Sequence, residues 1–386
     1  MIPCLCSWRL VVITAAVTAL VEFFPQRDTP GRAAYAQSPS VADVPVLQWD
    51  PTWPKPLPEK WALGPVVGVA VDTHDHIWIV HRVSALQKNE RYTAAAQNPP
   101  IAECCIPAPP ILEFDQAGNL VSSWGGPGEG YEWPQSEHGI FVDNKDYVWT
   151  AGNGEKDAQI LKFTRQGKFV LQIGRQGQSK GNNDTKNLRR AADIKVDPAA
   201  NEVYVADGYG NRRIIVFDAE SGAFKRMWGA YGNRPDDADI GGYKPGAPPA
   251  QQFRTAHGVN ISRDGLVYVA DRSNDRVQVF RKDGTFVKEG FVSTQTILSG
   301  SASGVAFSPD PQQRFLYVLD GANHRVWFLS RDSLRIVGKF GQHGHWGGQL
   351  DVPHNMAVDS KGHLYIGETL EGRRVQRFLY KNPARQ

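Results

Sequence analysis

The sequence predicts an all-β fold, a six-bladed β-propeller, and the main evidence is a repeat unit that occurs six times along the chain. Each repeat opens on a short β-rich run, such as GVAVD or GIFVD. A polar turn and a second β-rich run follow, as in HIWIVHR, EVYVADG and LVYVADR. Alternating β-branched and aromatic residues between turns indicate strands, and no stretch of comparable length has helical spacing.

A third and a fourth β-rich run are each visible in four of the repeats. Third runs appear as NRRIIVF, DRVQVF, HRVWFL and RRVQRF, and fourth runs as GNLVSSWG, GKFVLQIG, GAFKRMWG and the weaker LRIVGKFG. Four antiparallel strands per repeat and six repeats are typical of a propeller. The residues that open the six first strands are Val67, His138, Ala192, His257, Ser303 and His354.

The last repeat lacks a fourth strand of its own, because it stops after RRVQRFLY. The segment Val44–Trp49 resembles the fourth-strand runs. We expect it to pair beside the strand around Arg374–Phe378, completing the sixth blade and leaving no open sheet edge.

The N-terminal residues 1–36 have the features of a secretory signal peptide. Arg9 precedes the mainly apolar run Leu10–Phe24, and a small-x-small sequence, Ala34-Tyr35-Ala36, ends the segment. The apolar run is shorter than the ~20 residues that a membrane-spanning helix needs. We expect cleavage near Ala36 and an exported, monomeric protein, periplasmic or secreted, in which residues 37–386 form one propeller domain without a transmembrane segment. An uncleaved N-terminal anchor is the alternative.

Charge and cysteine content narrow the choice of partners and compartment. The formal charge is +3, and loss of three arginines and two acidic residues with the signal peptide leaves about +2, which argues against nucleic acid as a partner. In the mature chain only the neighbours Cys104 and Cys105 remain. They form either a vicinal disulfide or two loop thiols.

Histidine occupies the opening position of the first strand in blades two, four and six only, as His138, His257 and His354. Alternate blades of a six-fold ring lie about 120° apart, and equivalent positions on the innermost strands have similar height and radius. Three imidazoles can therefore converge on the axis. Three protein ligands with an open fourth position is the arrangement of catalytic zinc, so the sequence predicts a zinc site. The remaining histidines considered, His74, His76, His343, His345 and His363, are interpreted as surface residues.

The VYVAD run, followed by Asn or Asp and then RI or RV, resembles the NHL repeat from about residue 60 to 380. The histidine motifs EHG, AHG and PHN also resemble those of the peptidyl-α-hydroxyglycine α-amidating lyases, six-bladed propellers whose zinc is held by three histidines. That resemblance implies an enzyme, a carbon–nitrogen lyase that splits a carbinolamide into an amide and glyoxylate, with a peptide or small molecule as substrate. Further matches to the family's active site are Arg82 in IWIVHR, Tyr209 in ADGYGNRRI and Arg272 in VADRSNDRVQVF.

A departure from the family concerns a structural calcium. Asn355 stands where the family has an aspartate that binds this ion together with main-chain carbonyls, which fall at Val69 and Ile140 in this sequence. An asparagine still offers an oxygen ligand but carries no charge.

The resemblance also suggests residue roles. Zinc accepts the substrate hydroxyl as fourth ligand, and Tyr209 is the candidate general base. Because a phenol is a weak base at neutral pH, a nearby cation must stabilise its anion, and Arg82 can supply that charge. Either Arg82 or Arg272 can hold the substrate carboxylate. The insertion Val83–Pro110 is long for a loop, and we expect it to cover the channel mouth near Arg82.

Two other function classes are compatible with the repeat. One is a non-enzymatic propeller that binds a peptide, glycan or protein on the same face. The other is a metal-dependent lactonase or hydrolase, whose calcium chemistry requires oxygen ligands where this sequence has histidine nitrogens.

Overall fold

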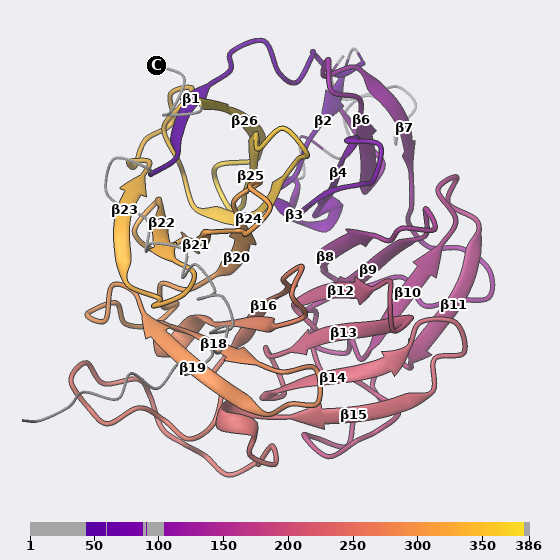
Figure 1. Cartoon of the computed structure of the whole chain (residues 1–386). Coiled ribbons are helices and arrows are strands. Elements are labelled where there is room, and N and C mark those ends of the chain that lie inside the picture. The colour runs from indigo at the N-terminus through magenta and orange to yellow at the C-terminus, as the bar shows by residue number, and fades with distance from the viewer. Residues whose placement is uncertain (1–43, 59, 88–89, 91–103, 382–386) are drawn as a thin grey trace, which may run out of the picture. The chain divides into compact units, whose positions relative to one another are not determined.

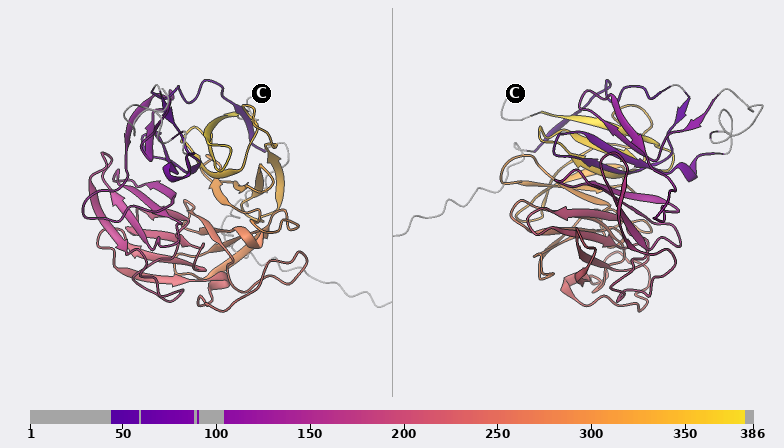
Figure 2. Two further views of the ribbon diagram at one scale, coloured as in Figure 1. Left: turned by 180° about the vertical axis from the view of Figure 1, so that it is seen from behind. Right: turned by 90° about the vertical axis from the view of Figure 1, so that its right-hand side faces the viewer.

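The computed structural model of the chain describes residues 44–58, 60–87, 90 and 104–381, so the predicted signal peptide lies outside the described residues. Six four-stranded antiparallel sheets are arranged as the blades of a propeller around a central axis (Figure 1). Figure 2 shows the ring from behind and from its side. The predicted six-bladed, all-β fold is confirmed.

Each blade runs from an innermost strand at the axis to an outermost strand at the rim. The strands of blades one to three are β3 (Val66–Val71), β4 (Ile77–His81), β6 (Ile111–Phe114), β7 (Leu120–Trp124); β8 (Glu137–Val142), β9 (Val148–Gly152), β10 (Gln159–Phe163), β11 (Phe169–Gly174); and β12 (Asp193–Asp197), β13 (Glu202–Asp207), β14 (Arg213–Asp218), β15 (Phe224–Trp228). Those of blades four to six are β16 (Ala256–Ile261), β17 (Val267–Asp271), β18 (Arg276–Phe280), β19 (Phe286–Phe291); β20 (Gly304–Phe307), β21 (Phe315–Asp320), β22 (Arg325–Ser330), β23 (Ile336–Phe340); and β24 (Pro353–Val358), β25 (Leu364–Glu368), β26 (Arg374–Lys381), β1 (Val46–Trp49).

The ring is closed by the N-terminal strand, as expected. Strand β1 pairs antiparallel with β26, with Val46 opposite Lys381 and Trp49 opposite Phe378. Blade six therefore contains strands from both ends of the domain, and the pairing of β1 with β26 closes the ring.

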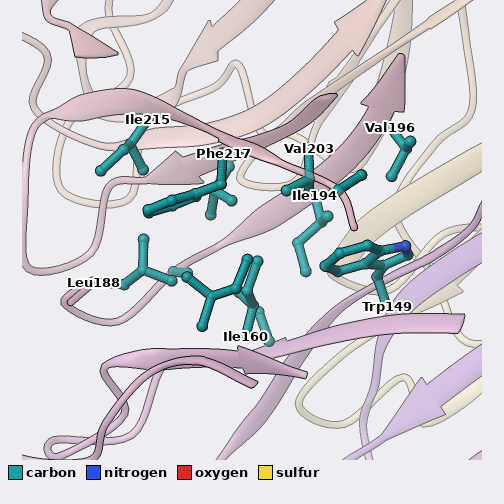
Figure 3. Close-up of a cluster of buried hydrophobic side chains, with 13 residues drawn as sticks. Trp149, Ile160, Leu188, Ile194, Val196, Val203, Ile215 and Phe217 are labelled. Carbon is teal, nitrogen blue, oxygen red and sulfur yellow. The ribbon is translucent and has the colours of Figure 1, made fainter. Parts of the chain in front are cut away.

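Hydrophobic side chains pack between neighbouring blades, and each of the six blade-to-blade contacts has its own buried cluster. Figure 3 shows the one between blades two and three, where Trp149 and Ile160 from one sheet face Ile194, Val203 and Phe217 from the next. These side chains are buried because the second and third strands of a blade have neighbours on both faces. Burial of these clusters makes the inner strands a rigid frame for the axis.

A buried ion pair recurs at the end of the second strand in blades three and four and accounts for the recurring Asp-to-Arg spacing after the VYVAD run. Asp207 accepts a 2.9 Å hydrogen bond from Arg213 Nε, and Asp271 accepts one of the same length from Arg276 Nε. All four side chains are fully buried. The aspartate that ends one strand thus pairs with the arginine that begins the next.

The insertion between β4 and β6 is described only in part. It begins with a 3₁₀ helix, η2 (Val83–Ala85), and ends with β5 (Ile106–Pro107), which pairs with β2 (Trp61–Ala62). Cys104 and Cys105 are paired as a disulfide. Residues 88–89 and 91–103 lie outside the described residues, so the expected cover over the channel mouth stays a prediction.

Two more 3₁₀ helices, η3 (Ala230–Gly232) and η4 (Arg272–Asn274), complete the elements of the described chain. No helix within these described ranges has the length and hydrophobicity needed to cross a bilayer.

Candidate functional site

His138, His257 and His354 lie at the axis, at the first-strand ends of blades two, four and six. All three side chains are buried. In β16 the pairing with β17 skips His257, since Ala256 lies opposite Asp271 and Gly258 opposite Ala270. The corresponding register shifts occur at His138 in β8 and at His354 in β24. A β-bulge re-aims the side chain of its extra residue, and here all three bulges turn an imidazole inward.

The three rings are oriented by the blades that lie between them. Nδ1 of His138 donates to the carbonyl of Ala192 at 2.7 Å. Likewise Nδ1 of His257 donates to the carbonyl of Ser303 at 2.5 Å, and Nδ1 of His354 donates to the carbonyl of Val67 at 2.9 Å. Each acceptor occupies the same repeat position on the next blade. Because a carbonyl only accepts, Nδ1 carries the proton and Nε2 keeps its lone pair, the state in which imidazole binds a metal.

One nitrogen from each histidine lies within 4.8 Å of the others, and the ring centroids are 4.6 to 5.1 Å apart. Burial lowers the pKa of all three, that of His354 to about 3 and those of His138 and His257 well below the usual range. Mutual repulsion with other histidines and the positive charges of Arg82 and Arg272 act in the same direction. Three neutral nitrogen donors therefore face one point.

Tyr209 reaches the same point from blade three. Its Oη lies 3.0 Å from Nε2 of His138 and 3.0 Å from Nε2 of His257. The preceding residue is Gly208, where a Cβ would come within 2.1 Å of the carbonyl oxygen of Ala256. Only glycine allows the chain to pass so close to β16 and to carry the phenol to the axis.

The donor set at the axis fits a divalent cation such as zinc. Two Nε2 lone pairs face one phenolic oxygen, and the single hydroxyl proton can satisfy only one of them. A cation held by the imidazoles removes this conflict, and three histidines with a fourth position open are ligands that zinc prefers.

The two predicted arginines lie at the site but differ in their contacts. Arg272 donates from Nη1 to Oη of Tyr209 at 3.0 Å, and its guanidinium carbon is 5.1 Å from the ring centroid. Arg82 instead donates from Nε to the carbonyl of Glu137 at 3.0 Å and from Nη2 to Oδ1 of Asn153 at 2.9 Å. The cation that donates directly to Tyr209 is thus Arg272, whereas Arg82, the nearby cation expected from the sequence, interacts with Tyr209 through its charge.

Two further residues at the site were missed by sequence reasoning. Asn153 accepts from Arg82 through its side chain and from Nε of Arg190 through its carbonyl at 2.8 Å. The guanidinium of Arg190 lies 5.9 Å from the centroid of the Tyr209 ring. Repeat register offered a signal for Asn153, which follows the second strand of blade two as Arg82 does in blade one. Arg190 lies in a connecting loop and has no such signal.

The residues of the expected calcium site lie on neighbouring innermost strands. Oδ1 of Asn355 accepts a hydrogen bond from the backbone N–H of Val69 at 3.2 Å. Ile140 is buried on β8. A role for these three residues as calcium ligands stays a prediction.

Of the histidines interpreted as surface residues, His74, His343 and His345 are exposed. His76 and His363 are half-buried. His76 Nδ1 lies 2.7 Å from the buried Glu113 carboxylate, and His363 Nδ1 accepts from the N–H of Tyr380. Both belong to contacts that hold turns in place.

A cavity of about 460 Å³ lies among loops at the end of the blades that carries the site. Its wall includes Thr255 and Ser273, which lie close in sequence to His257 and Arg272. Ile240, Tyr243, Ile297 and Leu298 contribute apolar surface. Such a cavity suits the larger part of a substrate whose reacting end lies at the histidines.

Comparisons with known proteins agree with the predicted resemblance. The NHL repeat family matches residues 253–280. The chain is 25% identical over 334 residues to peptidyl-glycine alpha-amidating monooxygenase A of Xenopus laevis, covering 83% of this chain and 32% of that protein. It is 24% identical over 341 residues to peptidyl-alpha-hydroxyglycine alpha-amidating lyase 2 of Drosophila melanogaster, covering 85% and 73%.

A relative with a different name is NHL repeat-containing protein 3 of Homo sapiens, 26% identical over 71% of this chain and 74% of that protein. Among solved structures, one described as a streptogramin B lyase matches with a TM-score of 0.50 and 11% identity over 83% of this chain and 94% of that chain. That likeness shows the propeller fold alone. The chain spans about a third of the length of the amidating monooxygenases it matches. It is a six-bladed propeller with an NHL repeat match at residues 253–280, and relatives at about 24% identity are named as amidating lyases.

Proposed function

We propose that this propeller is a zinc-dependent lyase that cleaves a carbinolamide, N–CH(OH)–COO⁻, into an amide and glyoxylate. The observation that carries the proposal is the convergence of three neutral imidazoles with Tyr209, whose Oη also accepts from Arg272. Relatives whose names include α-amidating lyase support the same reaction class.

The proposed metal ligands are His138, His257 and His354 through Nε2. Zinc, when bound, supplies a Lewis acid that favours loss of the substrate's hydroxyl proton. The Nδ1 bonds to three backbone carbonyls keep the rings in place and in the required tautomer. We keep a structural calcium near Val69, Ile140 and Asn355 as a separate proposal.

Tyr209 is the proposed base, and Arg272 is the charged side chain that donates to its hydroxyl oxygen. This hydrogen bond places the positive charge of Arg272 beside the phenolic oxygen that must accept the proton. As the hydroxyl carbon becomes the aldehyde of glyoxylate, the bond to nitrogen breaks. The proton taken by Tyr209 then passes to the amide nitrogen, so that the reaction is balanced without another reactant.

Arg82 is the proposed holder of the substrate carboxylate. Bonds from its Nε and Nη2 to Glu137 and Asn153 fix the guanidinium plane, and its remaining N–H groups are left to bind an anion. The acyl part of the substrate would extend toward the cavity lined by Thr255 and Ser273.

We also propose that the protein is exported after cleavage of residues 1–36. The disulfide between Cys104 and Cys105 is consistent with an oxidising compartment. Mass determination of the N-terminus of protein secreted by the native cell tests this proposal, and an uncleaved N-terminus would contradict it.

The mechanism is tested by separating metal binding from proton transfer. Tyr209→Phe removes the proton acceptor and no ligand, so zinc content should stay at that of the wild type while kcat falls about 10²–10⁴-fold. His257→Ala should lose both zinc and activity. A Tyr209→Phe variant with unchanged kcat would remove the base from the mechanism. Zinc retained in His257→Ala would contradict the proposed ligand set.

A further inference from the structure

Three arginines lie around Tyr209, and the proposed function uses two of them. Arg272 donates to the phenolic oxygen, and Arg82 is the proposed holder of the substrate carboxylate. The third, Arg190, lies in the connection between β11 and β12. Its guanidinium carbon is 5.9 Å from the centroid of the Tyr209 ring, compared with 5.1 Å for Arg272. Arg190 is thus nearly as close to the phenol ring as Arg272, and it has no role in the reaction proposed above.

Asn153 connects Arg190 to Arg82. Its side-chain oxygen Oδ1 accepts a hydrogen bond from Nη2 of Arg82 at 2.9 Å, and its backbone carbonyl accepts one from Nε of Arg190 at 2.8 Å. Oγ of Ser136 donates to the same Oδ1 at 2.9 Å, which fixes the orientation of the amide. One residue thus orients two guanidiniums that come from different parts of the chain.

The backbone of Arg190 is fixed against the proposed base. Its N–H donates to the carbonyl of Asp157 at 2.7 Å, and its own carbonyl accepts from the N–H of Tyr209 at 3.3 Å. Its φ of 61° lies in the left-handed region, which residues with a side chain seldom adopt and which these two contacts maintain. The side chain of Arg190 therefore starts from a fixed point beside Tyr209.

None of these three arginines has an acidic partner within ion-pair distance in the part of the chain that the structure describes. The negative charges of Glu137 and Asp157 reach Arg82, but their carboxylates accept hydrogen bonds from other groups. These donors are Nε1 of Trp133 for Glu137, and the N–H groups of Gln135, Ser136 and Gly154 for Asp157.

Other arginines of the protein are neutralised within the chain. Arg213 and Arg276 are each paired with a buried aspartate at 2.9 Å. Positive charges without such partners that gather around one polar site attract an anion. The three arginines around Tyr209 therefore indicate a place where an anionic ligand binds.

Arg82 and Arg190 both have donors that the chain does not use. Arg82 uses Nε and Nη2, and Arg190 uses Nε, whereas no acceptor for Nη1 of Arg82 or for Nη1 and Nη2 of Arg190 is found among the described residues. A guanidinium presents its N–H groups as a planar fork that fits a carboxylate. Because a carboxylate has about four acceptor positions, it can accept from two guanidiniums at once.

We propose that Arg190 is a substrate-binding residue and that it forms, with Arg82, a two-arginine clamp for the carboxylate of the carbinolamide. This rests on the proposed function, because it names the groups that hold the carboxylate of that substrate. The clamp fixes the acid group of the reacting carbon, so that the hydroxyl group is left to face Tyr209 and the histidines. It also selects a free carboxylate over its amide, since a neutral group would leave both cations unpaired.

The test measures the binding of two ligands that cannot react. Hippurate has the carboxylate but lacks the hydroxyl group, and hippuramide carries a neutral amide in place of the carboxylate. Titration calorimetry with zinc-loaded wild type should show a preference for hippurate. Arg190→Gln should weaken hippurate binding about 10–100-fold, the loss expected for charge-assisted hydrogen bonds, and should leave hippuramide binding unchanged.

Two further variants serve as matched comparisons. Arg190→Lys retains the charge without the planar fork, so its affinity for hippurate should lie between those of the wild type and Arg190→Gln. Arg189→Gln replaces the exposed neighbouring arginine and should bind hippurate as the wild type does. Zinc content should be equal in all these proteins, because none of the changes removes a proposed metal ligand.

Hippurate affinity that is unchanged in Arg190→Gln would overturn the clamp, as would a wild type that does not bind hippurate. Equal weakening of both ligands would also overturn it, because it would indicate that Arg190 only supports the loop. The clamp and the proposed reaction fail separately. If the zinc-loaded wild type released no glyoxylate from α-hydroxyhippurate while Arg190→Gln lost hippurate binding selectively, the lyase function would be wrong and the anion site would stand. Turnover with an unaltered KM in Arg190→Gln would overturn the clamp and leave the lyase function intact.

Discussion

Arg272 donates a 3.0 Å hydrogen bond from Nη1 to Oη of Tyr209. The two residues follow the second strands of adjacent blades, so the contact spans a blade interface. The same phenolic oxygen lies 3.0 Å from two axial histidines. Tyr209 is thereby held between a fixed cation and the proposed metal position. Arg82 instead donates to Glu137 and Asn153, so we expect the two arginines of the site to have different roles.

Replacing each arginine should affect different kinetic constants. Arg272→Gln removes the charge beside the phenol, and we expect kcat to fall roughly 10–100-fold with little change in KM. Arg82→Gln removes a carboxylate partner, and we expect mainly KM to rise. Steady-state kinetics with a carbinolamide substrate measures both constants. Arg335→Gln, at an exposed position on blade five, is the control. Identical changes in the two site variants would contradict the division of roles.

Closure of the ring by β1 should be visible in the stability. Leu47 is the one residue of β1 that points into the cluster between blades five and six. Leu47→Ala should lower the free energy of unfolding by about 2–3 kcal/mol, because it leaves a cavity at the closure. Gln48→Ala, at the exposed neighbouring position, should change it by less than about 0.5 kcal/mol. Denaturant unfolding gives both values, and equal effects would show that β1 does not support the ring.

The buried ion pair of the repeat should contribute far more than an exposed one. Arg276→Ala leaves Asp271 buried without its partner, and we expect a loss of roughly 3–5 kcal/mol in the free energy of unfolding. Arg331→Ala breaks the pair with the half-exposed Asp264, also 2.9 Å long, and should cost less than about 1 kcal/mol. The comparison is made by denaturant unfolding of the two variants. Similar losses would show that burial of the repeat pair is unimportant.

A buried histidine beside the site should make stability depend on pH. His81 accepts from the N–H of Gly64 and is fully buried, and burial lowers its pKa from 6.5 to about 4. Between these values the unfolded chain takes up a proton that the folded chain does not, so stability falls as pH decreases from 6.5 to 4. The contribution of His81 is about 3 kcal/mol over this range.

His81→Asn retains an acceptor near Nδ1 and cannot be protonated, so the dependence of unfolding free energy on pH should become shallower. His74→Asn, on the surface, is the control and should keep the slope of the wild type. If the unfolding free energies of His81→Asn and the wild type change equally between pH 4 and 6.5, His81 is not buried as a neutral ring.

The fold and the axial histidines were predictable because both follow from the repeat. Register alone places His138, His257 and His354 at one height. Because the last repeat has no fourth strand of its own, the segment Val44–Trp49 could be predicted to pair with β26. The partner of Tyr209 was not predictable in the same way. Arg82 and Arg272 follow equivalent strands, and the direction of each guanidinium depends on its local acceptors, such as Asn153 for Arg82.

Groups assembled from connecting loops were missed for a different reason. Arg190 lies in the connection between blades two and three. Loop conformation is set by specific contacts, here the hydrogen bond from Nε of Arg190 to the carbonyl of Asn153, and not by the repeat.

The central claim, that the axial site is a lyase centre, is tested most directly with α-hydroxyhippurate, a minimal carbinolamide. Purified protein loaded with zinc should convert it to benzamide and glyoxylate in equal amounts, and stripping the metal should abolish the reaction until zinc is restored. Absence of glyoxylate from the zinc-loaded wild type would contradict the lyase account and would favour a propeller that binds a peptide, glycan or protein at the same face.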